Sequence, residues 1–201
     1  MQTITEIIKP ISLLKGSHED TAQTGSGCFM NVIAYLNGEP QITDQSPCVC
    51  VTVRSIAIWF NDFLRDDERG EMIPFIERAM GSATNDEAEI SRRLGLMVKF
   101  AERQRDIAKS AANAANSANA ASYATSAASY ASSYASAANA VNCAAAASAA
   151  ASYATSAANE KFREQIKAAT LEFLDAALPK AVQPTGPLIE RAKSLVACAS
   201  H

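Results

Sequence analysis

One stretch of this chain restricts the fold more than any other: the 50 residues between Lys109 and Glu160 contain no charged side chain, no glycine and no proline. Residues 111–158 comprise 25 Ala, 10 Ser, 5 Asn, 4 Tyr and 2 Thr. Alanine has the highest helix propensity, so this composition favours helix over disorder. A single helix of 48 residues would be about 72 Å long, more than a domain of 201 residues can cover. We therefore expect two or three helices, with breaks in the Asn- and Ser-rich segments 113–119 and 139–142.

Three tyrosines of this stretch, Tyr123, Tyr130 and Tyr134, are seven and four residues apart and fall on one helical face. Small residues let neighbouring helices approach closely, while Ser and Asn hydrogen-bond across the contact. Two interpretations stay open: the tyrosines fill a seam between packed helices, or they line an uncharged cavity or docking face. A membrane span is disfavoured, because it needs about 20 apolar residues in a row and polar residues interrupt this stretch throughout. The sequence predicts an all-α multi-helix bundle with close-packed Ala-rich helices.

The rest of the sequence predicts helices with ordinary start and stop signals. Starts are expected at Ser26-Gly27, at Ser46-Pro47, in the acidic segment Asp66-Asp67-Glu68, at the capping box Thr84–Glu87, after Glu160 and at Leu188. Gly38 and Gly81 mark expected ends, and Pro74 predicts a kink or a break. The β-branched residues of the run 49–53 leave a strand as the alternative for that segment.

Apolar periodicity predicts the buried faces of two of these helices. In the helix that starts near residue 84, the expected buried stripe is Ile90, Leu94, Met97 and Ala101, opposite Arg93, Lys99 and Arg103. In the helix that follows Glu160, the expected stripe is Phe162, Ile166, Ala169, Phe173 and Leu174. Along the whole chain we expect a mobile or partly ordered lead-in over 1–25, a charged helical half over 26–110 and an Ala-rich helical half over 111–201, the two halves packed as one domain.

Composition disfavours several classes of function. A formal net charge of −3 offers no basic stripe for phosphates, so nucleic-acid binding is disfavoured. No N-terminal run resembles a secretory signal, so we expect a cytoplasmic protein. The five cysteines form no disulfide framework, and Cys28 with Cys48 and Cys50 lacks the usual spacing of a zinc site. We therefore expect no metal and no cofactor.

The side chains that could carry chemistry form three groups. The carboxylates of Asp62, Asp66, Asp67 and Glu68 could serve a carboxylate-dependent enzyme, or they could decorate a helix N-terminus and pair with Arg65 and Arg69. Cys28, at a helix N-terminus, is a candidate nucleophile without a neighbouring histidine. The candidate ligand-binding residues are Arg54, Arg78, Arg92, Arg93, Trp59, Asn61, Asp62, Tyr123, Tyr130 and Tyr134. Their guanidinium groups suit an anionic ligand and their rings suit a stacked base.

Part of the sequence resembles a known group of proteins. The run from Gly27 to Ser82 is similar to small bacterial and phage proteins, mostly uncharacterised, that share a Gly-Cys-x-Met start, an Asn-Asp pair and an Arg-x-x-x-x-Pro-x-Ile segment. The matching residues are Gly27, Cys28, Met30, Gly38, Glu39, Asp44, Cys48, Val49, Asn61, Asp62, Asp67, Arg69, Pro74 and Ile76. The Ala-rich stretch with its Tyr and Asn residues resembles that of immunity proteins from bacterial toxin systems. The resemblance implies a helical fold and a role, and no active site.

The expected function is that of a non-enzymatic binding protein that neutralises a partner, of the immunity or phage counter-defence type. The partner would be a protein toxin or a defence protein. A module that sequesters a nucleotide-like, anionic small-molecule signal is the first alternative, and a carboxylate-dependent enzyme is the second. Close-packed alanine faces could also lie between subunits, so a homo-oligomer is compatible with the sequence.

Overall fold

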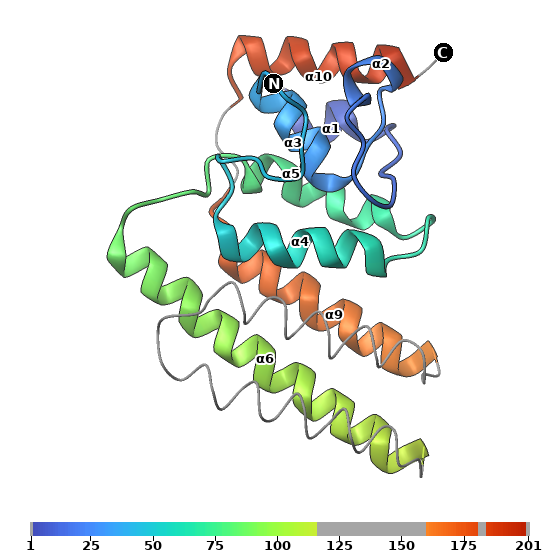
Figure 1. Cartoon of the computed structure of the whole chain (residues 1–201), viewed down its shortest axis with the longest axis vertical. Helices are drawn as coiled ribbons and strands as arrows, with labels where there is room; N and C mark the ends of the chain where they lie inside the picture. Colours follow the sequence, from blue (N-terminus) through green and yellow to red (C-terminus); the bar gives the residue numbers. More distant parts are fainter. Residues whose placement is uncertain (1, 116–159, 181–183, 200–201) are drawn as a thin grey trace. The chain divides into compact units, whose positions relative to one another are not determined.

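The computed structural model describes residues 2–115, 160–180 and 184–199 (Figure 1). The described residues form eight α-helices and one 3-10 helix, with no strand, which confirms the all-α prediction. The helices are α1 (Ile4–Ile8), α2 (Thr21–Thr24), α3 (Phe29–Asn37), α4 (Val51–Phe63), η1 (Arg69–Met72), α5 (Ile73–Ala79), α6 (Glu87–Ala115), α9 (Glu160–Ala177) and α10 (Gly186–Ala199). Their contacts divide the chain into unit 1, Met1–Thr84 with Leu178–His201, and unit 2, Asn85–Ala177.

The predicted Ala-rich helices fall mostly outside the described residues. Helix α6 continues through Ala115 into the first part of the expected break at 113–119. The rest of that segment, the expected break at 139–142 and the three tyrosines Tyr123, Tyr130 and Tyr134 lie outside the described residues. Their packing stays a prediction.

The first 25 residues of unit 1, expected as a lead-in, contain helices α1 and α2. Thr3 and Glu6 form a capping box at the start of α1, in which the Thr3 hydroxyl accepts the Glu6 amide and the Glu6 carboxylate accepts the Thr3 amide. Ile4 and Ile8 are fully buried, and α1 packs against α5 and α10. The segment is therefore part of the hydrophobic core of unit 1.

Helix α4 was predicted to begin at Ser46-Pro47, but it begins at Val51. The Ser46 hydroxyl donates to the Glu39 carboxylate instead of capping the helix, and the Ser46 carbonyl closes a turn by accepting the Val49 amide at 3.4 Å. Cys50 is the N-cap residue, and its amide donates to the Ser82 hydroxyl at 3.0 Å. The helical prediction for residues 51–63 is confirmed, and the strand alternative is wrong.

Helix α5 shows what Pro74 does in this sequence. The proline lies in the first turn of α5, where a missing amide hydrogen costs nothing. The 3-10 helix η1 therefore ends and α5 begins just before the proline, and α5 is not kinked by it. Gly81 follows the helix with a φ of 74°, in the left-handed region that favours glycine.

In unit 2, α6 packs against α9. Helix α6 begins close to the predicted position, and the Asp86 carboxylate accepts the Ala88 amide at 2.9 Å. The α9 stripe is confirmed, because Phe162, Ile166, Ala169, Phe173 and Leu174 are all buried.

The predicted buried stripe of α6 is wrong in part. Its buried residues are Arg93, Met97, Phe100, Gln104 and Ala108, whereas Ile90 is 41% exposed. Phe100 is the bulkiest side chain of this stripe, and its ring lies 5.0 Å from that of Phe173 on α9. The buried face of α6 is therefore the face that carries Phe100. Arg93, which was expected on the exposed face, belongs to this buried face.

Candidate functional site

Two of the predicted ligand-binding arginines, Arg54 and Arg78, bind backbone carbonyls of unit 1. Arg54 Nη1 donates to the carbonyls of Gln45 and Ser46, each at 3.3 Å. Arg78 Nε donates to the Pro179 carbonyl at 2.8 Å, and its guanidinium lies 5.6 Å from the centre of the Phe75 ring. Arg78 thereby attaches the chain that leads into α10 to helix α5. Both side chains act as structural ties.

The other two, Arg92 and Arg93, are neighbours on α6 and share one carboxylate. Glu89 accepts Arg92 Nε at 2.6 Å and pairs with Arg93 Nε at 2.7 Å. The hydrogen bond from Arg92, with the charges of both arginines, lowers the pKa of Glu89 from 4.5 to about 2. Arg92 Nη1 also donates to the Ala176 carbonyl at 2.8 Å, in the last turn of α9. Arg92 therefore joins the first turns of α6 to the end of α9.

The remaining predicted residues of unit 1 also have structural contacts. Trp59 is half-buried, and its ring lies 5.2 Å from that of Phe63 on the same helix. Asn61 is buried and bridges two segments: its Nδ2 donates to the Leu14 carbonyl at 2.8 Å, and its Oδ1 accepts the Phe29 amide at 3.2 Å. The Asp62 carboxylate accepts the Gly16 amide at 2.9 Å. The Asn-Asp pair thus holds the loop 14–16 and the start of α3 in place.

The predicted carboxylate cluster is paired internally. Glu68, which is buried, accepts both the Arg65 amide at 2.9 Å and the Arg65 guanidinium at 3.1 Å. Arg69 pairs with Asp66 and donates from Nε to the Asn61 carbonyl at 2.9 Å. In the described part of the chain, no three metal-ligating side chains lie close enough together to hold an ion.

Cys28 is the N-cap residue of α3, and its sulfur accepts the Asn31 amide at 3.5 Å. Burial raises the pKa of the Cys28 thiol from 9.0 to about 11, although the backbone amides of Asn31 and Met30 act in the opposite direction. The thiol therefore stays protonated at neutral pH and is a poor nucleophile.

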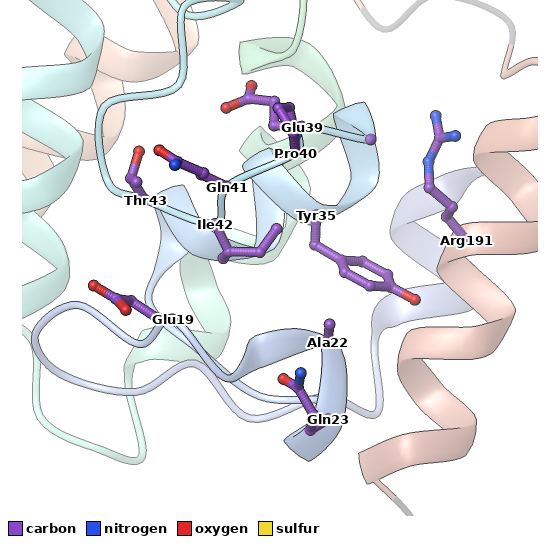
Figure 2. A pocket seen from close by; sticks show the side chains of 11 residues that line it. Glu19, Ala22, Gln23, Tyr35, Glu39, Pro40, Gln41, Ile42, Thr43 and Arg191 are labelled. Atoms are coloured by element: carbon purple, nitrogen blue, oxygen red, sulfur yellow. The ribbon is translucent and has the colours of Figure 1, made fainter.

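The structure reveals a cleft that the sequence did not predict. It lies in unit 1 between α2, the C-terminal end of α3, the following loop and α10, and its volume is about 660 Å³ (Figure 2). Its lining residues are Glu19, Ala22, Gln23, Tyr35, Gly38, Glu39, Pro40, Gln41, Ile42, Thr43 and Arg191. This volume falls within the range of small-molecule and cofactor sites, about 300 to 1,000 Å³.

Arg191 supplies the positive charge of the cleft. Its Nε donates to the Leu36 carbonyl at 2.6 Å, in the last turn of α3, which fixes the plane of the guanidinium. Neither Nη group has a hydrogen-bond or ion-pair partner among the residues that the structure describes. Arg191 therefore presents a fixed fork of donors, the geometry that binds a carboxylate or phosphate through two oxygens.

Gly38 makes this placement of Arg191 feasible. Its φ is 74°, and its amide ends α3 by donating to the Tyr35 carbonyl at 3.0 Å. A Cβ atom at this position would lie 3.2 Å from Arg191 Nη1 and 3.3 Å from Cζ. A glycine here both ends the helix and leaves room for the guanidinium.

Polar and apolar groups alternate along the rest of the cleft. The Tyr35 ring and the Ile42 side chain project into it, and Figure 2 shows the Tyr35 hydroxyl directed toward α10. Glu39 is engaged, because its carboxylate accepts Asn37 Nδ2 at 3.0 Å and the Ser46 hydroxyl. Glu19 is exposed and has no partner within the described ranges, and in Figure 2 it lies across the cleft from Arg191.

Only an indirect signal of this cleft is present in the sequence. Gly38 and Glu39 belong to the residues that carry the family resemblance, and Gly38 marked the end of a helix. Nothing in the local pattern connects them to Arg191, which is more than 150 residues away.

No helix of the described residues has the length and apolar character that a membrane crossing requires. Comparison of the chain with protein-family models, with curated proteins and with solved structures finds no match.

Proposed function

We propose that this chain is a non-enzymatic binding protein that neutralises a partner, of the immunity or counter-defence type, and that the cleft of unit 1 is its contact site. One observation supports this most: Arg191 is held in a fixed orientation at the cleft wall while both of its Nη groups have no partner among the described residues. Arg191 is half-buried, and charge-assisted hydrogen bonds from such a guanidinium are stronger than neutral ones, so a complementary anionic group of a partner would be bound favourably.

The side chains that the sequence suggested for catalysis support binding rather than catalysis. The candidate nucleophile Cys28 is protonated and buried, and the acidic residues near α4 and η1 are neutralised by arginines. General acid–base catalysis needs a titratable group whose pKa lies near the operating pH. Asp62 and Glu68 hold backbone segments in place, and the largely exposed Asp66 and Asp67 pair with Arg69 and Arg65.

The sequestration of a nucleotide-like signal is less well supported. The arginines named for it bind carbonyls and Glu89, and the cleft holds one arginine with two glutamates. A triphosphate carries several negative charges, which Glu19 and Glu39 would repel. A neutralised partner can instead present one carboxylate to Arg191 and keep its remaining surface neutral or basic.

The proposal is tested by native mass spectrometry of the protein purified from its own host. The wild type should carry a protein partner in a defined stoichiometry, and Arg191→Gln should lose at least 90% of this complex. Lys193→Gln is the matched control: it removes a positive charge from the same helix at a side chain that is 56% exposed and pairs with Glu190. A complex that is equally abundant in all three proteins would exclude the cleft as the contact site.

A further inference from the structure

The charges of the cleft indicate the kind of group that it binds, and this inference rests on the proposed function. We infer that the cleft takes an extended peptide segment of the partner that carries a carboxylate at one end and a cationic group at the other. Arg191 binds the carboxylate, and Glu19 binds the cation. The segment between these charges lies along Tyr35 and Ile42.

The position of Arg191 determines the anionic end. Its Nε is already bound to the Leu36 carbonyl at 2.6 Å, so the two Nη groups remain as donors in one plane. A planar carboxylate accepts two parallel N–H groups from such a fork. The carbonyl groups at the end of α3 carry partial negative charge close to Arg191, and this favours a singly charged carboxylate over a polyanion.

The position of Glu19 determines the cationic end. This carboxylate lies on the loop before α2, across the cleft from Arg191, and it has no partner in the described part of the chain (Figure 2). Opposite charges at the two ends of a cleft attract a dipolar ligand in one orientation and repel it in the other. The cleft therefore recognises the ligand by the charges at both of its ends.

The wall between the two charges suits a peptide backbone. Gln23 and Gln41 offer amide groups that can both donate and accept hydrogen bonds, as peptide N–H and C=O groups require. The Thr43 hydroxyl accepts the Gln45 amide at 3.1 Å and can still donate. Tyr35 and Ile42 supply apolar area for a side chain. A nucleotide would have to place its phosphates beside Arg191, where the negative charge of Glu39 would repel them.

The test uses one tetrapeptide, Ala-Phe-Ala-Ala, in four forms: both ends free, N-acetylated, C-amidated, and blocked at both ends. Binding to the full chain is followed by NMR titration, with ATP and free alanine as further probes. The form with both ends free should bind best, and each blocked end should weaken binding about tenfold, the effect expected for one charged hydrogen-bonded contact. ATP and free alanine should bind more weakly than the free tetrapeptide.

Two variants assign each charge to its residue. Arg191→Gln should bind the amidated and free-acid forms equally, whereas Glu19→Gln should bind the acetylated and free-amine forms equally. Glu19 is exposed, so Glu19→Gln tests the inference even where Arg191→Gln alters stability. Lys193→Gln should bind all four forms as the wild type does. Thermal unfolding of each variant confirms that it is folded.

Three outcomes would overturn the inference: equal affinity for all four forms, tighter binding of ATP than of any peptide, or free alanine binding as tightly as the tetrapeptide. The outcome is separable from that of the proposed function. If Arg191→Gln loses the partner while the four peptides bind alike, the proposed function stands and the peptide assignment fails. If the peptides follow the charge pattern while the partner complex does not depend on Arg191, the peptide assignment stands and the cleft is excluded as the contact site of the proposed function.

Discussion

In unit 1, polar side chains bind backbone groups that are far away in the sequence, whereas in unit 2 two long helices meet through apolar side chains with charged pairs beside them. Asn61 reaches the Leu14 carbonyl, Arg78 reaches the Pro179 carbonyl and Arg191 reaches the Leu36 carbonyl. In unit 2 the aromatic rings of Phe100 and Phe173 meet, and Glu89 pairs with two arginines.

The difference follows from the lengths of the elements. Helices of four to nine residues, such as α1, α2 and α3, leave many amide and carbonyl groups at their ends and in the loops between them. Buried Asn61 and half-buried Arg side chains satisfy some of these groups. A helix of 29 residues, such as α6, satisfies its own backbone, so its side chains are available for packing. We therefore expect unit 1 to depend on hydrogen bonds and glycines, and unit 2 to depend on apolar volume.

The largest expected effect is in unit 2. Replacement of Phe100 by Ala removes a buried ring whose centre lies 5.0 Å from that of Phe173, and it should lower the free energy of unfolding by about 4 kcal/mol. Guanidinium denaturation followed by circular dichroism measures this. Val98→Ala, a half-buried position on the same helix, serves as the control and should cost about 1 kcal/mol. Equal losses for the two variants would show that α6 and α9 are not held by this aromatic contact.

The corresponding test in unit 1 adds one atom rather than removing a ring. Gly25 ends α2 with a φ of 67°, and a Cβ there would lie 2.7 Å from Ala199 Cα and against the Ala199 amide of α10. Gly25→Ala should cost about 3 kcal/mol, from left-handed strain and from the displacement of α10. Gly81→Ala has the same strain with no neighbouring atom within 4 Å, and it should cost about 1 kcal/mol. A Gly25 variant no less stable than the Gly81 variant would contradict the close approach of α2 and α10.

A smaller loss is expected from the buried amide of Asn61. Asn61→Asp replaces the Nδ2 donor with an oxygen that faces the Leu14 carbonyl, so a buried hydrogen bond becomes a repulsion, and about 2 kcal/mol should be lost. Asp62→Asn keeps an oxygen that can accept the Gly16 amide, and its stability should change little. Thermal unfolding of both variants tests this. A stable Asn61→Asp protein would show that loop 14–16 is not held in this way.

Much of the helical fold could be predicted from the sequence, and the reasons are local. Capping signals and apolar periodicity indicated the helices that became α4, α6, α9 and α10, because each is long enough to show a period. Helices α1 and α2, of five and four residues, are too short for that signal, so they were not predicted. The stripe of α6 was misplaced because Arg93 is charged, and an ion pair with Glu89 accompanies its burial.

The candidate site could not be predicted, for a different reason. Arginine has five donors and no acceptor, and a sequence does not show whether they will bind a ligand, a carboxylate or a backbone carbonyl. Arg54, Arg78, Arg92 and Arg93 all found partners within the protein. Arg191 keeps donors without a partner among the described residues, and Gly38 leaves room for its guanidinium at the end of α3. That contact joins residues more than 150 positions apart.

The smallest expected effect concerns the pH dependence of stability, to which an ion pair in unit 2 contributes. Glu89 has a pKa lowered from 4.5 to about 2 by Arg92 and Arg93, so it stabilises the folded state while it is ionised. This contribution is complete above about pH 4.5 and is lost as the pH falls toward 2. Because the Glu89 and Arg92 side chains are 26% and 45% exposed, solvent screens the pair, and we expect about 1 kcal/mol.

Glu89→Gln should therefore destabilise the protein at pH 7 by this amount and flatten its loss of stability between pH 4.5 and 2, measured by urea denaturation at a series of pH values. Glu172→Gln is the control, because this carboxylate pairs with Arg103 between α6 and α9 at a site where both side chains are largely exposed. Its effect at pH 7 should be smaller than that of Glu89→Gln. If the two variants behaved alike, Glu89 would be an ordinary surface carboxylate. The ion pairs beside the buried Arg93 would then stabilise unit 2 no more than the exposed pair of Arg103 and Glu172 does.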